Sequence, residues 1–460
     1  MGSLLKAYNR GHVAAAVIAV ALACLLKATW FKWGDLVIDL GREVYVPARL
    51  AEGAVLYRDI FYLYGPLPPY LNAILFKIFG THILSLVLGG VLVTALTSVL
   101  LYKISRMFLN VFFATLTVLV FLFVLAFGHY VPIGNYNFIL PYSYPATHGI
   151  LFSLGALYFF FRSLDRPQAR YVVAAGACVF LAMVSRAEIG AMLALSLLPA
   201  VITVKRAGAK PPLARPLLLY PIAGACLVYG SLFLLAGPRI MESNLADLFR
   251  SNTQASPFAA LLSGINAPGQ NIGLMMKSAF FYLLFAVWFA LAGWGAGLAS
   301  RVQVPAARYA LYAVIAVAAG FGALAVLKTL YHFELQYRSL PLIYLGVGGA
   351  AAVACARRSR AAADLKMAAL ALFSFLLVLR ILLHVHAWHY GFYILVPGII
   401  VYHVFFFRTL PQLAASRFIA AAFYAGFTLV LVVLMAAHVR FSAAMYDQRT
   451  LAVPSPRGEI

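Results

Sequence analysis

Long apolar runs recur along the whole chain, and they constrain its fold more than any other feature. Each run holds about 20 residues, the length that an α-helix needs to cross a hydrocarbon layer of roughly 30 Å. Hydrophobic residues make up 64% of the 460 residues and charged residues only 10%, which lies outside the range of soluble globular domains. Because backbone in lipid must satisfy its own hydrogen bonds, these runs predict an all-α, polytopic helical membrane protein.

The runs divide the chain into about thirteen predicted spans, with interfacial helices expected in the first long loop. The predicted spans are 13–30, 81–102, 108–128, 148–162, 170–184, 187–204, 216–236, 277–298, 306–327, 338–356, 366–384, 389–407 and 417–437. Residues 1–437 are therefore expected to form one transmembrane unit, followed by a short extracytoplasmic tail over 438–460. Aromatic residues and a lysine follow the first run instead of a cleavage site, so it is predicted to be a retained span and not a signal peptide.

The charges predict how the chain is oriented. A net charge of +22 would suggest a nucleic-acid partner in a soluble protein, but here topology explains it, and no such partner is expected. With a cytoplasmic N-terminus, 19 of the 35 Lys and Arg residues fall in inner segments, whereas only Asp165 and Asp364 of the 13 carboxylates do. A generic depletion of acids in short inner loops is the alternative explanation. We expect the function to lie at the outer, extracytoplasmic surface.

The outer side also has the long predicted loops, 31–80, 129–147 and 237–276. The first of them carries five carboxylates within 25 positions, namely Asp35, Asp39, Glu43, Glu52 and Asp59. The pattern of this loop predicts a short interfacial helix from Val44 to Glu52, with Pro47 in its first turn. Its apolar side would be formed by Val44, Ala48, Ala51 and Val55. The prolines of Tyr64–Pro69 predict a rigid, non-helical turn before the chain re-enters the membrane.

Two acids of the first loop are candidates for chemistry. Asp39 lies just past the first span, where a carboxylate partly removed from water can serve as a general base. It could equally cap the helix that follows, since Asp favours that position. Asp59 follows Arg58 and lies among tyrosines, and the alternative there is a surface ion pair of small energetic value.

Basic residues near the outer ends of spans are candidates for binding an anion. The tight turn between the fifth and sixth spans contains Arg186 and Glu188, at a depth where ionisable groups usually face a cavity. Arg186 is a candidate phosphate ligand, or else one half of a turn pair that reaches up to water. Lys328, Arg338 and Arg380 lie at similar depths, and together they could surround an anionic headgroup.

A histidine group gives an alternative site. His384, His386 and His389 lie together, and His332 and Glu334 lie in a neighbouring outer loop. Imidazole and carboxylate ligands suit a divalent metal such as zinc or manganese. The spacing matches no specific ligand pattern, and histidines beside aromatic residues are ordinary at a membrane interface. The sequence therefore predicts no definite cofactor or metal site, and a divalent metal stays an alternative.

The first loop resembles that of the membrane glycosyltransferases of the GT-C fold. The resemblance rests on Asp39, on Glu52-Gly53, on Tyr57-Arg58-Asp59 and on the Gly-Pro-Leu turn, and it is weaker at 185–188 and 389–397. The nearest likeness is to the bacterial aminoarabinose transferases for lipid A and the protein O-mannosyltransferases. Many relatives have adjacent Asp-Glu where this chain has Asp39-Leu40, and often Lys where it has Arg186.

The resemblance implies an inverting sugar transfer at the outer face of the bacterial inner membrane. The donor would be a polyprenyl-phosphate-linked sugar, and the acceptor a lipid, glycan or protein. Asp39 would be the catalytic acid-base residue and Asp59 the second acid of the loop, while Arg186 would meet the donor phosphate. Further donor contacts are expected from Arg58, Lys328, Arg338 and Arg380. Supporting roles are expected for Glu43, Tyr57, Tyr64, His148, Glu188 and His389.

Two other functions fit the same features. A glycolipid transporter or flippase would use the same cations to guide a headgroup, but no internal repeat is recognisable and polar groups near mid-span are scarce. A surface-polysaccharide ligase or polymerase would share the donor and the side of the membrane, and would differ mainly in its acceptor.

Overall fold

The computed structural model describes residues 2–35, 38–206, 215–238, 257–330, 335–357, 362–450, 454–455 and 458–459. Within these ranges the chain is helical apart from one antiparallel pair of two-residue strands, β1 (Pro454–Ser455) and β2 (Gly458–Glu459). The predicted all-α class is confirmed, and the protein is a polytopic membrane protein.

The first half of the chain carries three kinds of helix. The α-helices are α1 (Gly2–Ala28), α2 (Leu40–Ala51), α3 (Leu67–Phe79), α4 (Ile83–Ser105), α5 (Val111–Val120), α6 (Tyr144–Asp165), α7 (Ala169–Ser185), α8 (Ala187–Arg206) and α9 (Tyr220–Ala236). The π-helical segments are η1 (Phe121–Ala126), which continues α5, and η2 (Arg215–Leu219), which leads into α9.

The second half is built in the same way. Its α-helices are α11 (Pro257–Ser263), α12 (Pro268–Ala299), α13 (Pro305–Leu330), α14 (Leu340–Arg357), α15 (Ala362–Val378), α16 (Gly391–Ile394), α17 (Val396–Val404), α18 (Leu410–Gln412) and α19 (Arg417–Asp447). Short 3-10 turns form η4 (Leu335–Tyr337) and η5 (Leu379–Ile381), and η6 (Phe405–Thr409) is π-helical.

Nine helices in the described part of the chain are long and apolar enough to cross a membrane. The predicted count of thirteen is therefore not confirmed. The four predicted spans outside these nine are 108–128, 148–162, 170–184 and 389–407. In the first and third of them the helices are shorter, and the fourth is divided among α16, α17 and η6. In the second, most side chains of α6 are buried, so this helix lies among other helices and needs less apolar surface.

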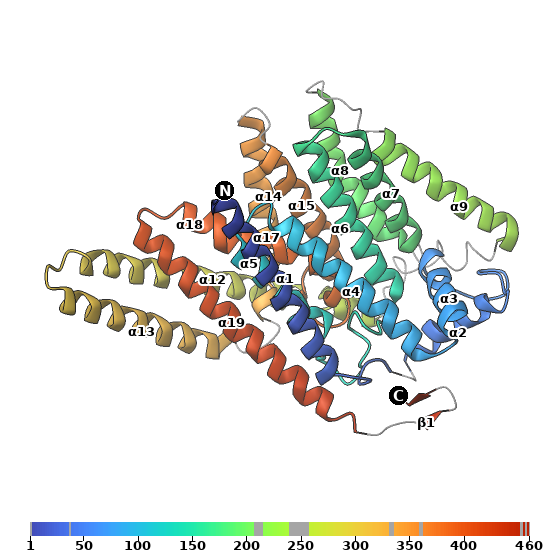
Figure 1. The fold of residues 1–460 in the computed structure, drawn as a ribbon, viewed down its shortest axis with the longest axis horizontal. Coiled ribbons are helices and arrows are strands. Elements are labelled where there is room, and N and C mark those ends of the chain that lie inside the picture. Colours follow the sequence, from blue (N-terminus) through green and yellow to red (C-terminus); the bar gives the residue numbers. More distant parts are fainter. Residues whose placement is uncertain are drawn as a thin grey trace.

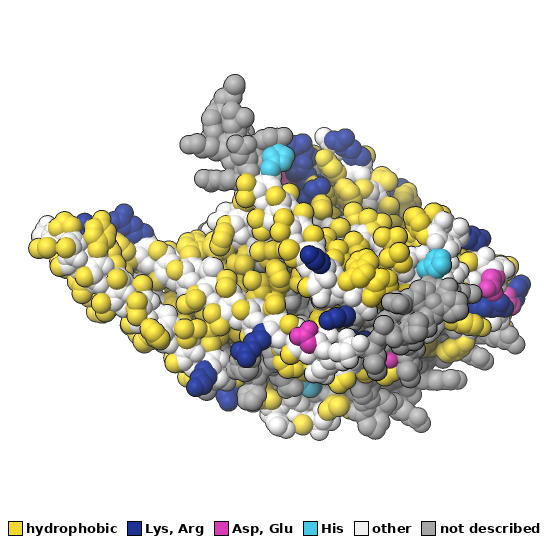
Figure 2. All heavy atoms as spheres, turned by 60° about the horizontal axis from the view of Figure 1, so that its bottom comes forward, with side chains coloured by type: hydrophobic (Ala, Val, Ile, Leu, Met, Phe, Trp, Pro, Cys, Tyr) yellow, Lys and Arg dark blue, Asp and Glu magenta, His cyan; other side chains and the backbone are white. Residues whose placement is uncertain are grey.

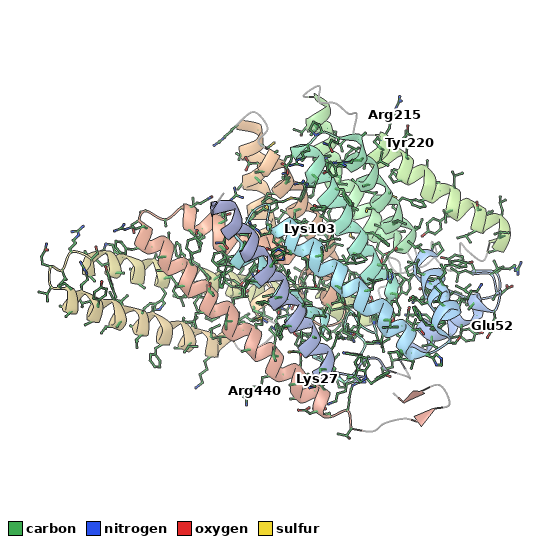
Figure 3. The ribbon with its side chains drawn as sticks, viewed as in Figure 1. Lys27, Glu52, Lys103, Arg215, Tyr220 and Arg440 are labelled. Atoms are coloured by element: carbon green, nitrogen blue, oxygen red, sulfur yellow. The ribbon has the colours of Figure 1, made fainter. Side chains whose placement is uncertain are left out.

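The helices form a broad bundle with two projecting parts (Figure 1). On one side α12 and α13 form an antiparallel hairpin with α19 packed along it, and on the other side α2 and α3 pack on each other. Arg215, which the sequence predicts on the inner side, lies near one end of the bundle, whereas Lys27 and Arg440 lie near the other (Figure 3). On the face drawn in Figure 2, hydrophobic side chains cover most of the described surface, as expected of surface that meets lipid.

The first loop differs from its prediction in two places. The interfacial helix begins at Leu40 and not at Val44, so Pro47 lies inside α2 and not in its first turn. Val46 and Leu50 are buried on the side that packs on α3, while Val44, Ala48 and Ala51 of the predicted stripe are partly buried against the core of the bundle. The predicted turn over 64–69 is also helical in its second half, where α3 begins with its prolines in the first turn. Proline costs little there, since the first amides of a helix lack partners anyway.

Candidate active site

Three charged residues meet at the N-terminal end of α2. Nη1 of Arg42 lies 3.1 Å from Oδ1 of Asp39, and its Nε and Nη2 donate to Oε1 of Glu43 at 3.2 and 3.0 Å. Nη2 also donates to the backbone oxygen of Tyr142 at 2.6 Å. One guanidinium therefore holds two carboxylates and ties the first loop to the loop over residues 129–147.

The backbone at Asp39 is unusual for the residue that precedes a helix. Its φ is 64°, in the left-handed region that costs a non-glycine residue energy, and its side chain makes no capping hydrogen bond. The side chain of Asp39 therefore does not cap α2, which was the alternative considered from the sequence. The neighbouring backbone is fixed by the loop over residues 129–147, where Asn135 donates to the oxygen of Ile38 at 3.2 Å. Asp39 is thus held by its surroundings with its carboxylate turned toward Arg42.

Glu43 lies beneath this surface, with only 3% of its area exposed. Burial raises the pKa of its carboxyl from 4.5 to about 7, against the opposing attraction of Arg42 and a backbone hydrogen bond from Tyr144. Its protonation thus changes near neutral pH, and with it the charge next to Arg42.

A second charged group lies between α7 and α8. The guanidinium of Arg186 is buried, with 2% exposed, and its Nε donates to Oε1 of Glu188 at 2.5 Å. Nη1 of Arg380, from η5, donates to the same oxygen at 3.2 Å. Two guanidinium groups thus converge on one carboxylate where α7, α8 and η5 meet. Such a pair can receive a phosphate, because guanidinium donors match phosphate oxygens.

Two tyrosines join the charged groups. The ring of Tyr64 lies between them, 5.3 Å from the guanidinium of Arg42 and 5.0 Å from that of Arg186. Tyr142 accepts from Arg42 at its backbone oxygen and from Nη1 of Arg186 at its hydroxyl, the latter at 3.4 Å. The contacts therefore run from Asp39 through these tyrosines to the Arg186 group. We call this set the polar cluster, and its members are Asp39, Arg42, Glu43, Tyr64, Tyr142, Arg186, Glu188 and Arg380.

Gly65 allows the first loop to approach this closely. A Cβ at this position would lie 2.3 Å from the backbone oxygen of Val184 and 2.6 Å from that of Ser185. Only glycine fits against that backbone, so Tyr64 reaches Arg186 because residue 65 has no side chain.

Aromatic side chains line the rim of the polar cluster. Tyr390 lies under Arg380, with 4.0 Å from guanidinium to ring centre, and Tyr393 lies 5.3 Å from Arg186. His389 packs edge-on against Tyr136 at 4.4 Å, and burial lowers the pKa of its imidazole to about 4. His389 is thus neutral at ordinary pH and belongs to the aromatic rim.

Other predicted residues lie elsewhere. Asp59 pairs with Arg58 at 2.9 Å and accepts from the amide of Val55 at 2.8 Å, so it orders a local surface turn. This side-chain pairing lowers the pKa of Asp59 to about 2, and Arg49 contributes through its charge. Arg49 lies ten residues after Asp39, which is about 15 Å along the helix at 1.5 Å of rise per residue, so the Asp59 turn lies toward the other end of α2.

Two cations of the predicted phosphate-binding ring are also placed away from Arg186. Lys328 is exposed on α13, a helix that packs on α12 and α19. Arg338 is buried and donates to Oδ1 of Asn271 and to the oxygen of Leu383, both at 2.8 Å. Only Arg380 of that set meets Arg186 through a shared carboxylate.

The remaining supporting residues have structural contacts beside the polar cluster. The hydroxyl of Tyr57 donates to the backbone oxygen of Tyr64, which fixes the approach of the tyrosine ring. Nδ1 of His148 pairs with the backbone oxygen of Tyr144 at 2.8 Å, and Tyr144 in turn contacts Glu43 through its backbone.

The alternative metal site has no support in the described ranges. No three His, Cys, Asp or Glu side chains there come together in a way that could hold a metal ion. His384 and His386 lie with their ring centres 4.7 Å apart, and His386 stacks on Trp388. His332 and Glu334 lie outside the described residues.

Sequence reasoning missed several residues of the polar cluster and of its aromatic rim. Arg42 lies between two acids in a chain that has few acids, and that spacing was a signal for it. Tyr142, Tyr390 and Tyr393 had no such signal, because they reach Arg186 and Arg380 only through the packing of distant loops.

A family model matches a part of the chain that contains some of these contacts. Residues 64–233 match the dolichyl-phosphate-mannose-protein mannosyltransferase family. This match confirms the resemblance to membrane glycosyltransferases that the first loop predicted. It covers Tyr64, Tyr142, Arg186 and Glu188, and it begins after Asp39. No curated protein sequence matches the chain.

Solved structures show weaker likenesses. One is the oligosaccharyltransferase from Archaeoglobus fulgidus in complex with zinc and sulfate, at 14% identity and a TM-score of 0.49, covering 94% of this chain and 53% of that one. Another is ArnT from Cupriavidus metallidurans bound to undecaprenyl phosphate, at 15% identity and a TM-score of 0.39, covering 85% of this chain and 77% of that one. The chain thus spans about half the length of the archaeal enzyme.

Proposed function

We propose that this protein is an inverting membrane glycosyltransferase that uses a polyprenyl-phosphate-linked sugar as donor. The observation that carries the proposal is the polar cluster, in which a carboxylate suited to a general base is joined to two convergent guanidinium groups. The family match over residues 64–233 supports the reaction class. Two of the similar structures contain a polyprenyl-type phosphate, dolichol-phosphate in the archaeal AglB enzyme and undecaprenyl phosphate in ArnT.

Asp39 is the proposed base. The acceptor hydroxyl oxygen attacks the anomeric carbon of the donor sugar while its proton passes to the carboxylate of Asp39. The bond between the anomeric carbon and the phosphate oxygen breaks, and its electron pair leaves with the polyprenyl phosphate. Arg42 orients the carboxylate through the 3.1 Å ion pair. Attack opposite the leaving group inverts the anomeric configuration.

Arg186 and Arg380 are proposed to bind the donor phosphate. The charge that collects on the leaving phosphate is stabilised best by donors that are already in position. Glu188 holds both guanidinium groups at one oxygen, which keeps them together before the donor arrives. The acceptor, a lipid, glycan or protein, would approach from the Asp39 side at the outer face of the membrane. Asp59 and Arg58 would order the loop around the site.

The test is sugar transfer from a polyprenyl-phosphate donor by the purified protein in lipid nanodiscs. Asp39→Asn keeps the size of the side chain and removes the base, so we expect transfer to fall at least about 100-fold, the lower end of what a general base contributes. Glu52→Gln is the matched control, since Glu52 is an exposed carboxylate at the other end of α2 (Figure 3). Near-normal transfer by the Asp39→Asn protein, with an unchanged melting temperature, would refute the proposal.

A further inference from the structure

Arg42 is shared between two carboxylates that differ in their exposure. Its Nη1 lies 3.1 Å from Oδ1 of Asp39, while its Nε and Nη2 donate to Oε1 of Glu43 at 3.2 and 3.0 Å. The side chain of Asp39 is 28% exposed and that of Glu43 only 3%. An acceptor molecule can therefore reach Asp39, whereas Glu43 lies beneath the surface and can influence the reaction only through its neighbours.

The groups that face Glu43 come from three parts of the chain. Asp39 and Arg42 belong to the same helix end, and the charge of Asp39 opposes the ionisation of Glu43. The other groups are the phenols of Tyr62 and Tyr64, from the segment before α3, and the backbone amide of Tyr144, from α6. Burial raises the pKa of both phenols, so they stay uncharged at neutral pH. Of these groups, Arg42 is the one that carries a positive charge.

The protonation of Glu43 decides how much of the charge of Arg42 is left for Asp39. With both carboxylates ionised, Asp39, Arg42 and Glu43 together carry one net negative charge, and with Glu43 protonated they carry none. A cation favours the ionised form of a neighbouring carboxyl group, and a like charge disfavours it. Asp39 therefore takes up a proton more readily while Glu43 is ionised and accepts from Nε and Nη2 of Arg42.

We propose that Glu43 is a positioning residue that keeps Asp39 effective as a base by engaging Arg42. The inference rests on the proposed function, in which Asp39 takes the proton of the acceptor hydroxyl. Glu43 contacts neither substrate. Its ionised form holds two donors of Arg42 and leaves one to Asp39, whereas its protonated form leaves the charge of Arg42 to Asp39 alone.

Burial makes this influence depend on pH in the neutral range. It raises the pKa of Glu43 to about 7, so most molecules have an ionised Glu43 at about pH 8 and a protonated one at about pH 6. Asp39 is then the stronger base at the higher pH. Sugar transfer should accordingly rise as the pH increases through about 7.

The first experiment measures the coupling between the two carboxyl groups without any substrate. Infrared spectra of the full chain in lipid nanodiscs are recorded across the neutral pH range, and the protonated carboxyl band that Glu43→Gln lacks is assigned to Glu43. By linkage, Asp39 and Glu43 change each other's proton affinity by the same factor. We expect Asp39→Asn to lower the pKa of Glu43 by about one unit, which is about tenfold in proton affinity. Glu52→Gln, which removes an exposed carboxylate at the other end of α2, should leave it unchanged.

The second experiment measures kcat and KM against pH, with the polyprenyl-phosphate-linked sugar that supports transfer in the test of the proposed function. The kcat of the original protein should fall about threefold from about pH 8 to about pH 6, because only part of a tenfold loss of proton affinity reaches the rate. Glu43→Gln mimics the protonated carboxyl, so its kcat should stay at the lower value over this range, with the KM for the donor unchanged. Glu52→Gln should follow the original protein.

The outcomes separate this inference from the proposed function. The inference is overturned if the Glu43 band titrates at the same pH in the original protein and in Asp39→Asn. It is also overturned if the kcat of Glu43→Gln falls with pH as much as that of the original protein does. Near-normal transfer by Asp39→Asn would refute the proposed function instead, and it would do so without changing the infrared result.

Discussion

The buried carboxyl of Glu43 gives a quantitative prediction about stability and pH. With its pKa raised from 4.5 to about 7, the folded protein binds a proton over a pH range in which the unfolded chain has released it. Stability therefore falls as the pH rises from about 4.5 to about 7, and it levels off above that range. The full change corresponds to about 3 kcal/mol at 1.36 kcal/mol per pKa unit. Glu43→Gln mimics the neutral carboxyl and should remove this dependence.

The assay is thermal unfolding in one detergent, between about pH 5 and pH 8, for the original protein and for Glu43→Gln. The original protein should lose melting temperature relative to the variant as the pH rises, with most of the loss below about pH 7. Glu52→Gln, which replaces an exposed carboxylate of the same helix, should run parallel to the original protein. If the Glu43→Gln curve is also parallel to that of the original protein across the whole range, the burial of Glu43 does not control its protonation as reasoned here.

Three further perturbations test how the polar cluster and the loops around it are held in place. Gly65→Ala should lower sugar transfer at least about tenfold by forcing the first loop away from the α7–α8 turn, whereas Gly349→Ala, which has open space around it, should be neutral. Tyr64→Phe should keep most of the transfer activity because it keeps the ring between the two guanidinium groups, whereas Tyr64→Leu should lose that activity. Equal activity of the two variants would show that the ring does not bridge the two groups. Arg449 donates to the backbone oxygens of Gly34 and Pro132 at 2.6 and 2.9 Å. Arg449→Ala should therefore speed amide hydrogen exchange around residue 34, and unchanged exchange would contradict this anchoring role.

The sequence indicated which helix ends carry the candidate site, because charged residues are rare in this chain and few positions could hold it. Asp39, Arg186 and Arg380 were candidates because of their depth and sidedness, and the family resemblance supported the first two. The structure brings the three residues into one cluster. Glu188 was identified with Arg186 because the two lie in one tight turn. These inferences depended on local spacing and on the expense of charge near lipid.

Other features could not be predicted from spacing. Lys328 was predicted at a depth similar to that of Arg380, but α13 packs on α12 and α19, and a predicted depth does not show which helices are neighbours. The start of α2 was predicted four residues late, since the helix is stabilised by packing on α3 in spite of Pro47. α6 was predicted as a span from the length of its apolar run, but a helix that is surrounded by protein meets little lipid and needs less apolar surface.

The most direct test of the central claim separates binding from transfer. Polyprenyl phosphate binding should be nearly unchanged in Asp39→Asn, because this residue acts on the acceptor proton. It should weaken about tenfold or more in Arg380→Gln, a partly exposed position that can be changed without emptying the core. Transfer should fail in Asp39→Asn despite normal donor binding. If Asp39→Asn instead loses donor binding, or Arg380→Gln binds the lipid phosphate as tightly as the original protein, the assignment of the two ends of the polar cluster is contradicted.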